Sequence, residues 1–378
     1  MLQGVHVGET IERLAAIGGR GGGTDAERRA AVWLERHLRE RGHQAWTDTV
    51  WVRPGWAWPV ALAALLGAGG SLASVAWPLA GLIAAAFAAA SLALDGAGLT
   101  SPLRLLTRRR ATQNVAVLPE AHGDVVTLIV CAPYDAPRRG LVLNDRWRAA
   151  VRRLGDVRLW LAGCALVIAG AAAARLAGID ASWLGAIQLV PTVVLIAALA
   201  AAVDVGLSEF SPGAGPASAA AAALAVHEEL AADPEAMPVG VLLYGAGASG
   251  PHGLRALLRR ERPDRSRTVL LELGPCAEGV PAWRTRHPQL RRAALLAADA
   301  LGIDSRHRPR PVRGAGRLPA IRIACLDDRG IAARSHQPDD TAGAVDLTAA
   351  DRAVDLALGV ADAVAAELTA AQRGTVSA

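Results

Sequence analysis

Histidine and carboxylate residues lie close together near the C-terminal end of the sequence, in the segment RSHQPDDT at 334–341. His336 is followed by a short polar turn and then by Asp339 and Asp340. Imidazole and carboxylate groups are common metal ligands, and a carboxylate often orients a metal-bound histidine through its second ring nitrogen. A zinc site normally has three or four protein ligands, so the role of His336 depends on what the rest of the chain supplies.

Other catalytic motifs are missing from the sequence. No GxSxG segment precedes a helix and no HExxH segment occurs. The glycine-rich segment GAGASG at 245–250 follows a predicted strand, but it lacks the spacing and the downstream acid of a dinucleotide-binding fingerprint. A P-loop is excluded because it needs a lysine, and the chain contains none.

The four cysteines are isolated in apolar surroundings and form no CxxC pair; they are Cys131, Cys164, Cys276 and Cys325. We therefore expect buried free thiols in a reducing compartment, and neither a zinc knuckle nor a disulfide framework. The N-terminal segment has no basic stretch followed by an apolar core, so no cleavable signal peptide is predicted.

The amino-acid composition indicates which class of protein this is and which partners to expect. Hydrophobic residues make up 52% of the 378 residues and the mean hydropathy is +0.27, above the usual range of soluble proteins. Part of the chain is therefore expected in lipid. The net charge of +5 comes entirely from arginine, which we interpret as the codon bias of a GC-rich genome. No basic stripe is interleaved with aromatic residues, so nucleic acid is not predicted as a partner.

A first apolar region predicts a membrane-spanning hairpin. No charged residue occurs at 54–94, which is about twice the ~20 residues that one spanning helix needs. The hairpin can break at Gly67–Ser71 or, alternatively, at Trp77–Pro78. Tryptophans near both ends of this region suit the interfacial belt of a membrane protein. We assign the hairpin to 54–95.

A second apolar region, at 159–203, is interrupted only by Arg175 and Asp180. These two charges lie midway, where the turn of a hairpin would emerge into water, and we assign a second transmembrane hairpin to 158–204. The alternative for both regions is a pair of buried core helices in a large soluble protein.

Arginine-rich segments predict the orientation in the membrane. Segment 104–110 follows the first hairpin and segment 146–158 leads into the second, while the two predicted turns carry one arginine between them. The positive-inside rule then predicts a multi-pass protein of the cell membrane whose soluble domain faces the cytoplasm.

The polar segments at 1–53, 96–157 and 205–378 are expected to form one discontinuous α/β domain. Short β-rich runs bounded by glycine, proline or charge predict buried strands at 124–132, 237–246, 267–274 and 318–326. Helical spacing of apolar residues predicts helices at 10–19, 24–42 (with Thr24 as N-cap), 216–232, 250–261 and 347–368. The alternation predicts a mostly parallel sheet with helices on both faces.

Six segments of this domain, in order, resemble motifs of the co-catalytic di-zinc aminopeptidases of peptidase family M-28. The matching segments are GGRGGGTDAERRAAVWLERHLRERG at 18–42, CAPYDA at 131–136, SPGAGPASAA at 211–220, LYGAGASGPHGL at 243–254, LLELG at 270–274, and LPAI at 318–321 with HQPDDT at 336–341. The resemblance implies an aminopeptidase-like fold into which the two apolar hairpins are inserted.

The resemblance also implies where the catalytic groups should lie. In that family an aspartate and a water bridge two zinc ions, and a glutamate is the general base. The ligand and base positions fall on Pro133 (first histidine), Gly215 or Pro216 (bridging aspartate), Gly247 (base), Ala248 (second glutamate), Glu272 (in place of an aspartate) and His336. Only Glu272 and His336 could still coordinate, and they belong to different metals. We therefore expect no cofactor, with zinc as the alternative.

The remaining polar residues of this region have structural expectations. His336 is expected to be hydrogen-bonded to Asp339 or Asp340, and Asp135, which in the family orients the first histidine, is expected to cap a loop. Asp135, His252 and Asp340 are candidates for residues of the cleft, and His227 is a further candidate nearby. A one-metal site of His252, Glu272 and His336 is the alternative arrangement.

Three functions remain open. The first is a membrane-anchored pseudopeptidase that binds a peptide or a membrane-protein partner. The second is a working zinc aminopeptidase with a rearranged site. The third is a structural membrane protein that oligomerises through small residues such as Gly163 and Gly170. The oligomeric state is not predicted.

Overall fold

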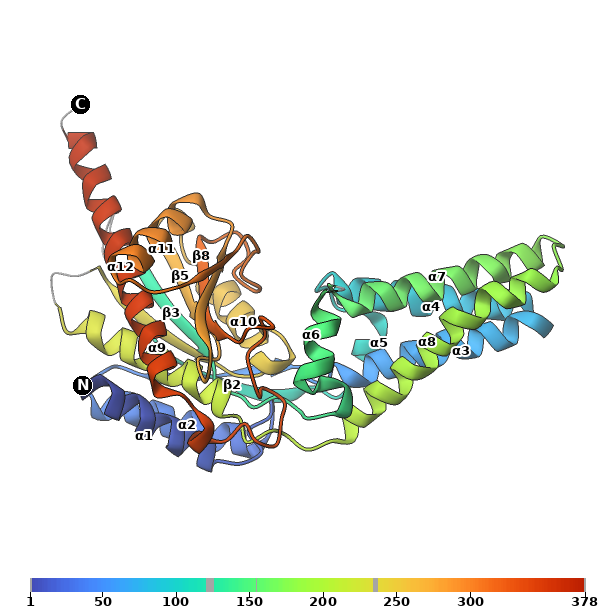
Figure 1. Cartoon of the computed structure of the whole chain (residues 1–378), viewed down its shortest axis with the longest axis horizontal. Coiled ribbons are helices and arrows are strands. Elements are labelled where there is room, and N and C mark those ends of the chain that lie inside the picture. The colour runs from blue at the N-terminus through green and yellow to red at the C-terminus, as the bar shows by residue number, and fades with distance from the viewer. Residues whose placement is uncertain (1, 120–125, 154, 234–236, 377–378) are drawn as a thin grey trace. The chain divides into compact units, whose positions relative to one another are not determined.

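The computed structural model describes residues 2–119, 126–153, 155–233 and 237–376. The chain divides into two compact units (Figure 1). The α/β unit comprises Met1–Pro54, Arg110–Pro137 and Phe210–Ala378, and the helical unit comprises Gly55–Arg109 and Arg138–Glu209. Segments 96–109, 138–157 and 205–209, which the sequence suggested for the polar domain, belong to the helical unit.

The α/β unit contains an eight-stranded sheet in the order β1-β2-β4-β3-β5-β8-β6-β7. Its strands are β1 (Trp46–Val52), β2 (Arg110–Val117), β3 (Thr127–Pro133), β4 (Val239–Tyr244), β5 (Thr268–Leu273), β6 (Val280–Thr285), β7 (Arg306–Arg308) and β8 (Ala320–Leu326). Strands β4, β3, β5 and β8 are parallel neighbours, while β1, β2 and β6 pair antiparallel with β2, β4 and β8. The predicted mostly parallel sheet and its four predicted strands are confirmed; positions 124–125 lie outside the described residues.

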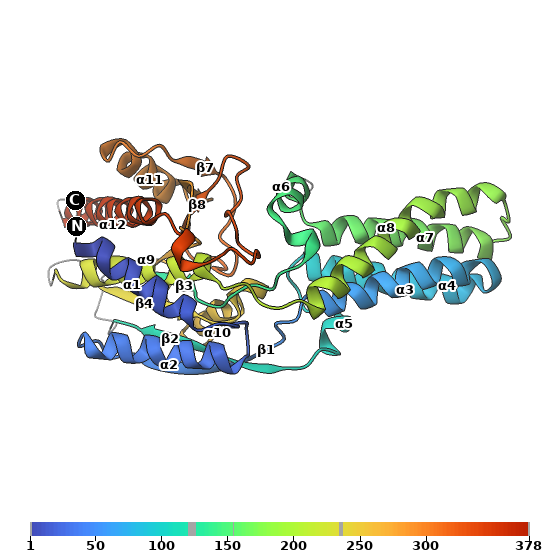
Figure 2. The same ribbon diagram turned by 60° about the horizontal axis from the view of Figure 1, so that its bottom comes forward.

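Helices cover both faces of the sheet, as predicted. The first face carries α1 (Leu2–Ala16), α2 (Asp25–Glu40), α9 (Ala214–Ala231), α11 (Pro288–Ala300) and α12 (Leu347–Val376). Figure 2 shows α1, α9 and α12 lying side by side. The second face, called the α10 face below, carries α10 (His252–Glu261), which contacts β1, β2 and β4.

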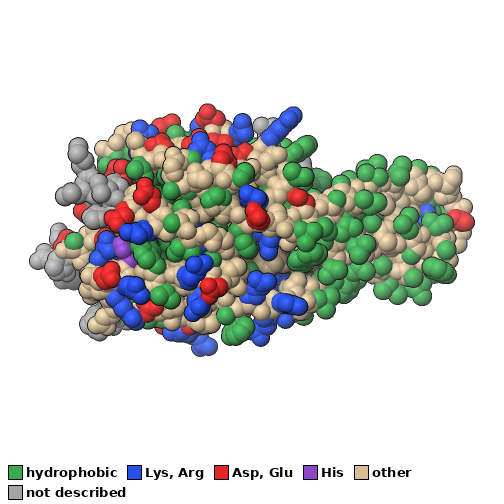
Figure 3. Space-filling view, turned by 90° about the horizontal axis from the view of Figure 1, so that it is seen from below, with side chains coloured by type: hydrophobic (Ala, Val, Ile, Leu, Met, Phe, Trp, Pro, Cys, Tyr) green, Lys and Arg blue, Asp and Glu red, His purple; other side chains and the backbone are tan. Residues whose placement is uncertain are grey.

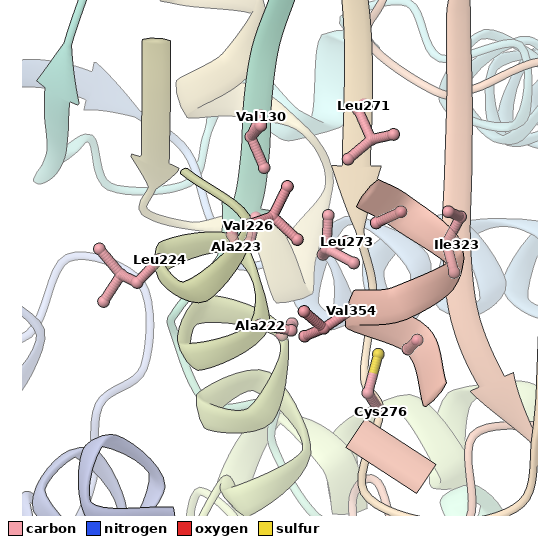
Figure 4. Packing of buried hydrophobic residues seen from close by; sticks show 14 of the residues in the cluster. Val130, Ala222, Ala223, Leu224, Val226, Leu271, Leu273, Cys276, Ile323 and Val354 are labelled. Atoms are coloured by element: carbon pink, nitrogen blue, oxygen red, sulfur yellow. The ribbon is translucent and has the colours of Figure 1, made fainter. Parts of the chain in front are cut away.

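The main core lies between the sheet and the helices of the first face. Figure 4 shows Val130 of β3 near Val226 of α9, and Leu273 of β5 near Val354 of α12. Successive residues of each buried strand point to opposite faces, so the parallel strands are mainly apolar on both sides, with Glu272 in β5 and Arg322 in β8 as charged exceptions. The Thr24 hydroxyl accepts a hydrogen bond from Glu27 N, which confirms the predicted N-cap of α2.

The helical unit contains four helices that are long and apolar enough to cross a membrane. They are α3 (Ala57–Ala76), α4 (Pro78–Gly96), α7 (Val157–Leu176) and α8 (Ser182–Leu207), accompanied by the short α5 (Pro102–Leu105) and α6 (Asp145–Arg153). Large apolar side chains such as Leu72, Ile83 and Val190 are exposed on their surface, and Figure 3 shows apolar side chains spread over this unit. Exposed apolar area of this extent suits contact with lipid.

The two hairpin turns are at Trp77–Pro78 and between α7 and α8. The suggested break at Gly67–Ser71 is wrong, because these residues lie inside α3. Gly70 instead packs on α4: a Cβ atom there would lie 3.0 Å from Gly81 O. Pro78 starts α4 and disfavours helical backbone in the residue before it, which places the break at Trp77. The predicted turn around Arg175 and Asp180 is confirmed.

Polar side chains connect the helices inside this unit. Arg175 donates to Ser74 Oγ (2.8 Å) and to Gln188 Oε1 (2.7 Å), joining α7 to α3 and α8. Asp95 pairs with Arg104 (2.8 Å) and with Arg158 (3.1 Å). Buried polar groups in an apolar bundle need such partners, and these bonds orient the helices relative to one another.

Candidate functional site

The positions implied by the family resemblance gather at the carboxyl ends of the parallel strands. Pro133 ends β3, Tyr244 ends β4 and is followed by the glycine-rich turn, and Glu272 is near the end of β5. The carboxyl ends of parallel strands meet at one edge of a sheet, which is where open α/β sheets usually bind ligands. Connectivity therefore brings these residues together, although they are far apart in sequence.

Asp135 holds the glycine-rich turn through its backbone. Its carboxylate is buried and accepts hydrogen bonds from Gly247 N (2.6 Å) and Ala248 N (3.1 Å). Burial, and then the nearby Glu27 carboxylate, raise the pKa of Asp135 well above its usual range. The side chain thus caps a loop, which is the structural role expected for it.

Glu27 binds the backbone of Ala246, the residue before Gly247 in the glycine-rich turn. This role was not predicted from the sequence. It is buried and accepts from Ala246 N (2.8 Å), Thr112 Oγ1 (2.7 Å) and Gly23 N (2.6 Å). Burial raises the pKa of Glu27 to about 7. The spacing of Thr24 and Glu27, typical of a capping box, was the available signal. Two buried carboxylates therefore bind three consecutive backbone N–H groups, those of residues 246–248.

Gly247, the position of the family's general base, has no room for a side chain. A Cβ atom there would lie 2.4 Å from Pro133 Cβ, 2.8 Å from Tyr244 Cε2 and 3.1 Å from Asp135 Oδ1. These contacts are closer than van der Waals packing allows. The packing of the turn at 246–248 therefore requires glycine at position 247.

Glu272 is engaged in a buried ion pair. Its Oε1 atom accepts from Tyr244 Oη (2.8 Å) and from the guanidinium of Arg322 on the neighbouring strand β8. Although burial alone would lower the pKa of Arg322, the Glu272 carboxylate raises it above its ordinary value. The Oε2 atom of Glu272 is buried and has no hydrogen-bond partner among the described residues.

Gly215 and Asp340 contact each other at the start of α9. Asp340 accepts from Gly215 N (2.8 Å) and from Ser211 Oγ (3.3 Å), and its burial raises its pKa to about 6. Gly215 and Pro216 lie in the first turn of α9, so Asp340 occupies the start of that helix. The expected hydrogen bond from His336 to Asp339 or Asp340 stays a prediction.

The three candidate histidines lie in different parts of the fold. His336 has a left-handed backbone (φ 81°) in a tight turn, and His252 starts α10. His227 lies on α9 with its ring 4.7 Å from that of His43, and burial lowers its pKa to about 4. His227 is therefore a neutral core histidine at physiological pH.

The donor groups at this edge do not suit a zinc ion. Within the described ranges, no group of three or more His, Cys, Asp or Glu side chains is placed to hold a metal. Glu272 is paired with Arg322, and Asp135 is occupied by backbone N–H groups. His252, Glu272 and His336 are not brought together as a three-ligand site.

A cavity of about 410 Å³ opens beside the turn at 246–248, and we call this cavity the cleft. Of the positions predicted from the sequence, Gly247, Ala248 and Glu272 line it. The other predicted positions do not line it, namely Pro133, Asp135, Gly215, Pro216, His252, His336 and Asp340. Four arginines also line it: Arg284, Arg308, Arg313 and Arg322. No local sequence pattern marks these arginines, because they are spread over β6, β7, β8 and a loop.

Comparisons with known proteins identify the fold. A scan of protein-family models finds no match to the sequence, and neither does a search of curated proteins. Among solved structures, a zinc-dependent exopeptidase from Parabacteroides distasonis is 12% identical with a TM-score of 0.55, and the match covers 95% of this chain and 97% of that chain. The glutaminyl cyclase of Porphyromonas gingivalis is 12% identical with a TM-score of 0.54, covering 97% and 98%.

A zinc aminopeptidase from Bacillus subtilis is 11% identical with a TM-score of 0.53, covering 94% of each chain. At these identities the likeness concerns the fold and not the chemistry. The strand order, the carboxyl-edge turn and these neighbours agree: this chain has an aminopeptidase-like fold of the M-28 type.

Proposed function

We propose that this protein is an integral membrane, aminopeptidase-like protein that does not hydrolyse peptides and that binds a peptide or protein partner in its cleft. Its soluble unit faces the cytoplasm in this proposal, because the arginine-rich segments flank the predicted spanning helices. The proposal combines the aminopeptidase-like fold with a cleft whose edge carries structural groups in place of catalytic ones.

The packing around Gly247 is the observation that carries the proposal. Hydrolysis by this fold would need a general base beside a metal-bound water. At Gly247 the space for any side chain is filled by Pro133 and Tyr244, and the adjacent carboxylates of Glu27 and Asp135 bind backbone N–H groups. A carboxylate that accepts several backbone hydrogen bonds is committed to holding the loop.

The test is an aminopeptidase assay, with and without added Zn²⁺, on the detergent-purified full chain, together with elemental analysis of the same sample. We expect no turnover above a buffer blank. We also expect only trace amounts of metal, far below one ion per chain. Activity that is lost in His336→Ala, with one or two metals per chain, would overturn the proposal and establish a rearranged metallopeptidase site.

A further inference from the structure

A row of charged side chains crosses four neighbouring strands on the α10 face of the sheet. Glu272 of β5 lies opposite Arg322 of β8, which lies opposite Arg284 of β6. Arg284 in turn lies opposite Arg308 of β7. Residues directly opposite each other point to the same face, and adjacent strands are ~4.8 Å apart. All four side chains line the cleft, together with Arg313.

This row has more positive than negative charge. Among the described residues that line the cleft, Glu272 is the only acid, and its Oε1 atom is paired with Arg322. Arg284 and Arg308 form no ion pair with a described residue, although Arg308 donates to Gly330 O (3.3 Å). Like charges on adjacent strands repel one another, so the arrangement is unfavourable without a counter-charge.

Two atoms in the cleft are buried and lack hydrogen-bond partners among the described residues: Arg284 Nε, a donor, and Glu272 Oε2, an acceptor. Burial and the adjacent Arg322 guanidinium lower the pKa of Arg284 to about 10. The lowered pKa shows that the positive charge of Arg284 is not balanced by nearby negative charge. A buried polar group without a partner costs free energy, so each of these two atoms calls for a partner such as an ordered water, an ion or a ligand.

We propose that the arginine row of the cleft binds a phosphate-type dianion, with Arg284 and Arg308 on the anion and Glu272 Oε2 accepting a hydrogen bond from the ligand. The planar guanidinium group makes paired hydrogen bonds to phosphate oxygens. Two uncompensated guanidinium groups match a dianion better than a monocarboxylate. Gly274 makes room for this row, because a Cβ atom there would lie 2.7 Å from a terminal nitrogen of Arg322.

This inference deepens the proposed function and rests on its premise that the cleft holds a ligand and does not cleave one. The proposed occupant is a ligand that presents a phosphate group; whether that group is free or attached to a peptide is decided by the test below.

The test is calorimetric titration of the detergent-purified full chain with inorganic phosphate, with an O-phosphoserine peptide and its unphosphorylated form, and with acetate. We expect saturable one-to-one phosphate binding that is weakened about tenfold or more in Arg284→Gln and in Arg308→Gln. Arg284→Lys, which keeps the charge but not the planar fork, should retain part of the affinity. Tighter binding of the phosphopeptide than of phosphate would identify a phosphorylated peptide as the source of the group.

Two matched variants remove one positive charge outside the cleft. Arg259→Gln and Arg265→Gln each change a residue that lines a different arginine-rich cavity, which includes part of α10. Both should bind phosphate like the wild type. Equal loss in these variants, equally tight binding of acetate, or no saturable binding at all would each overturn the inference. The aminopeptidase assay separates the two proposals, since an inactive protein that does not bind phosphate contradicts only this one.

Discussion

At the scale of single residues, the carboxyl edge of the sheet is organised by carboxylates that bind backbone. Asp135 and Glu27 hold residues 246–248, and Asp340 holds the start of α9 through Gly215 N. Each of these bonds fixes a stretch of backbone at this edge. The three carboxylates are therefore predicted to affect the stability of the fold.

The two glycines at family ligand or base positions should respond differently to a methyl group. Gly247→Ala should lower the free energy of unfolding by ~1–3 kcal/mol, because its Cβ would lie 2.4 Å from Pro133 Cβ. Gly215→Ala should be neutral or slightly stabilising, because its nearest contact would be 3.5 Å and alanine favours a helix. Thermal unfolding of the full chain in detergent checks this pair, and equal effects would contradict the described packing.

Stability should depend on pH through Glu27. Its pKa is about 7 in the folded protein, against ~4.3 for an unfolded glutamate, so the folded state binds more protons between these values. The free energy of unfolding should therefore fall, by on the order of 1–3 kcal/mol, as the pH rises from about 5 to 7. Asp135 and Asp340, whose pKa values are also raised, act in the same direction.

Unfolding measured from pH 5 to pH 8 tests this dependence. Glu27→Gln should reduce the slope, whereas Glu40→Gln, at an exposed position, should leave it unchanged. A slope that is the same in Glu27→Gln as in the wild type would mean that this carboxyl does not titrate in the expected window.

At the scale of elements, the close approach of α3 and α4 depends on small residues. A Cβ atom on Gly81 would lie 2.6 Å from Gly70 O and from Ser74 Cα, so Gly81→Ala should destabilise the hairpin by ~1–3 kcal/mol. Gly69→Ala, on the exposed side of α3 with nothing within 4 Å, should be neutral or stabilising. Thermal unfolding in detergent measures both; a tolerated Gly81→Ala would refute this packing.

Gly163 and Gly170, proposed from the sequence as oligomer contacts, have no neighbour within 4 Å of an added Cβ atom. They are not used for packing inside the helical unit. Their role in an oligomer stays a prediction that crosslinking in membranes can test, with a monomer as the contradicting result.

At the scale of the whole molecule, the predicted topology can be tested by cysteine labelling. In a Cys164→Ser background, Asp180→Cys lies in the exposed turn of the second hairpin and Glu40→Cys lies at the exposed end of α2. A membrane-impermeant maleimide should label position 180 in intact cells and position 40 only after lysis, because the positive-inside rule places the arginine-rich segments in the cytoplasm. The reverse pattern would invert the orientation, and protection of both positions in intact cells would contradict spanning hairpins.

Local sequence patterns were sufficient for much of the fold. Strands β3, β4, β5 and β8 are largely buried on both faces and so appear as mainly apolar runs, and the four helices that are apolar enough to span a membrane appear as long stretches with few charges. Strands β1, β2, β6 and β7 gave no such signal; β6, for example, contains Pro281, and β7 is the polar tripeptide Arg306–Arg308. Their strand geometry depends on pairing with neighbours that are distant in sequence.

The sequence by itself determined the order of the predicted strands and helices, the apolar hairpins and the presence of residues without metal-binding side chains at Pro133, Gly247 and Ala248, because each is a property of residue types along the chain. Only the tertiary structure decided that Glu272 pairs with Arg322 and that Arg284 and Arg308 continue the same row. Strand register places residues from distant segments opposite one another, and no local pattern encodes that alignment. The charge of the cleft is therefore a property of the folded sheet and not of any motif.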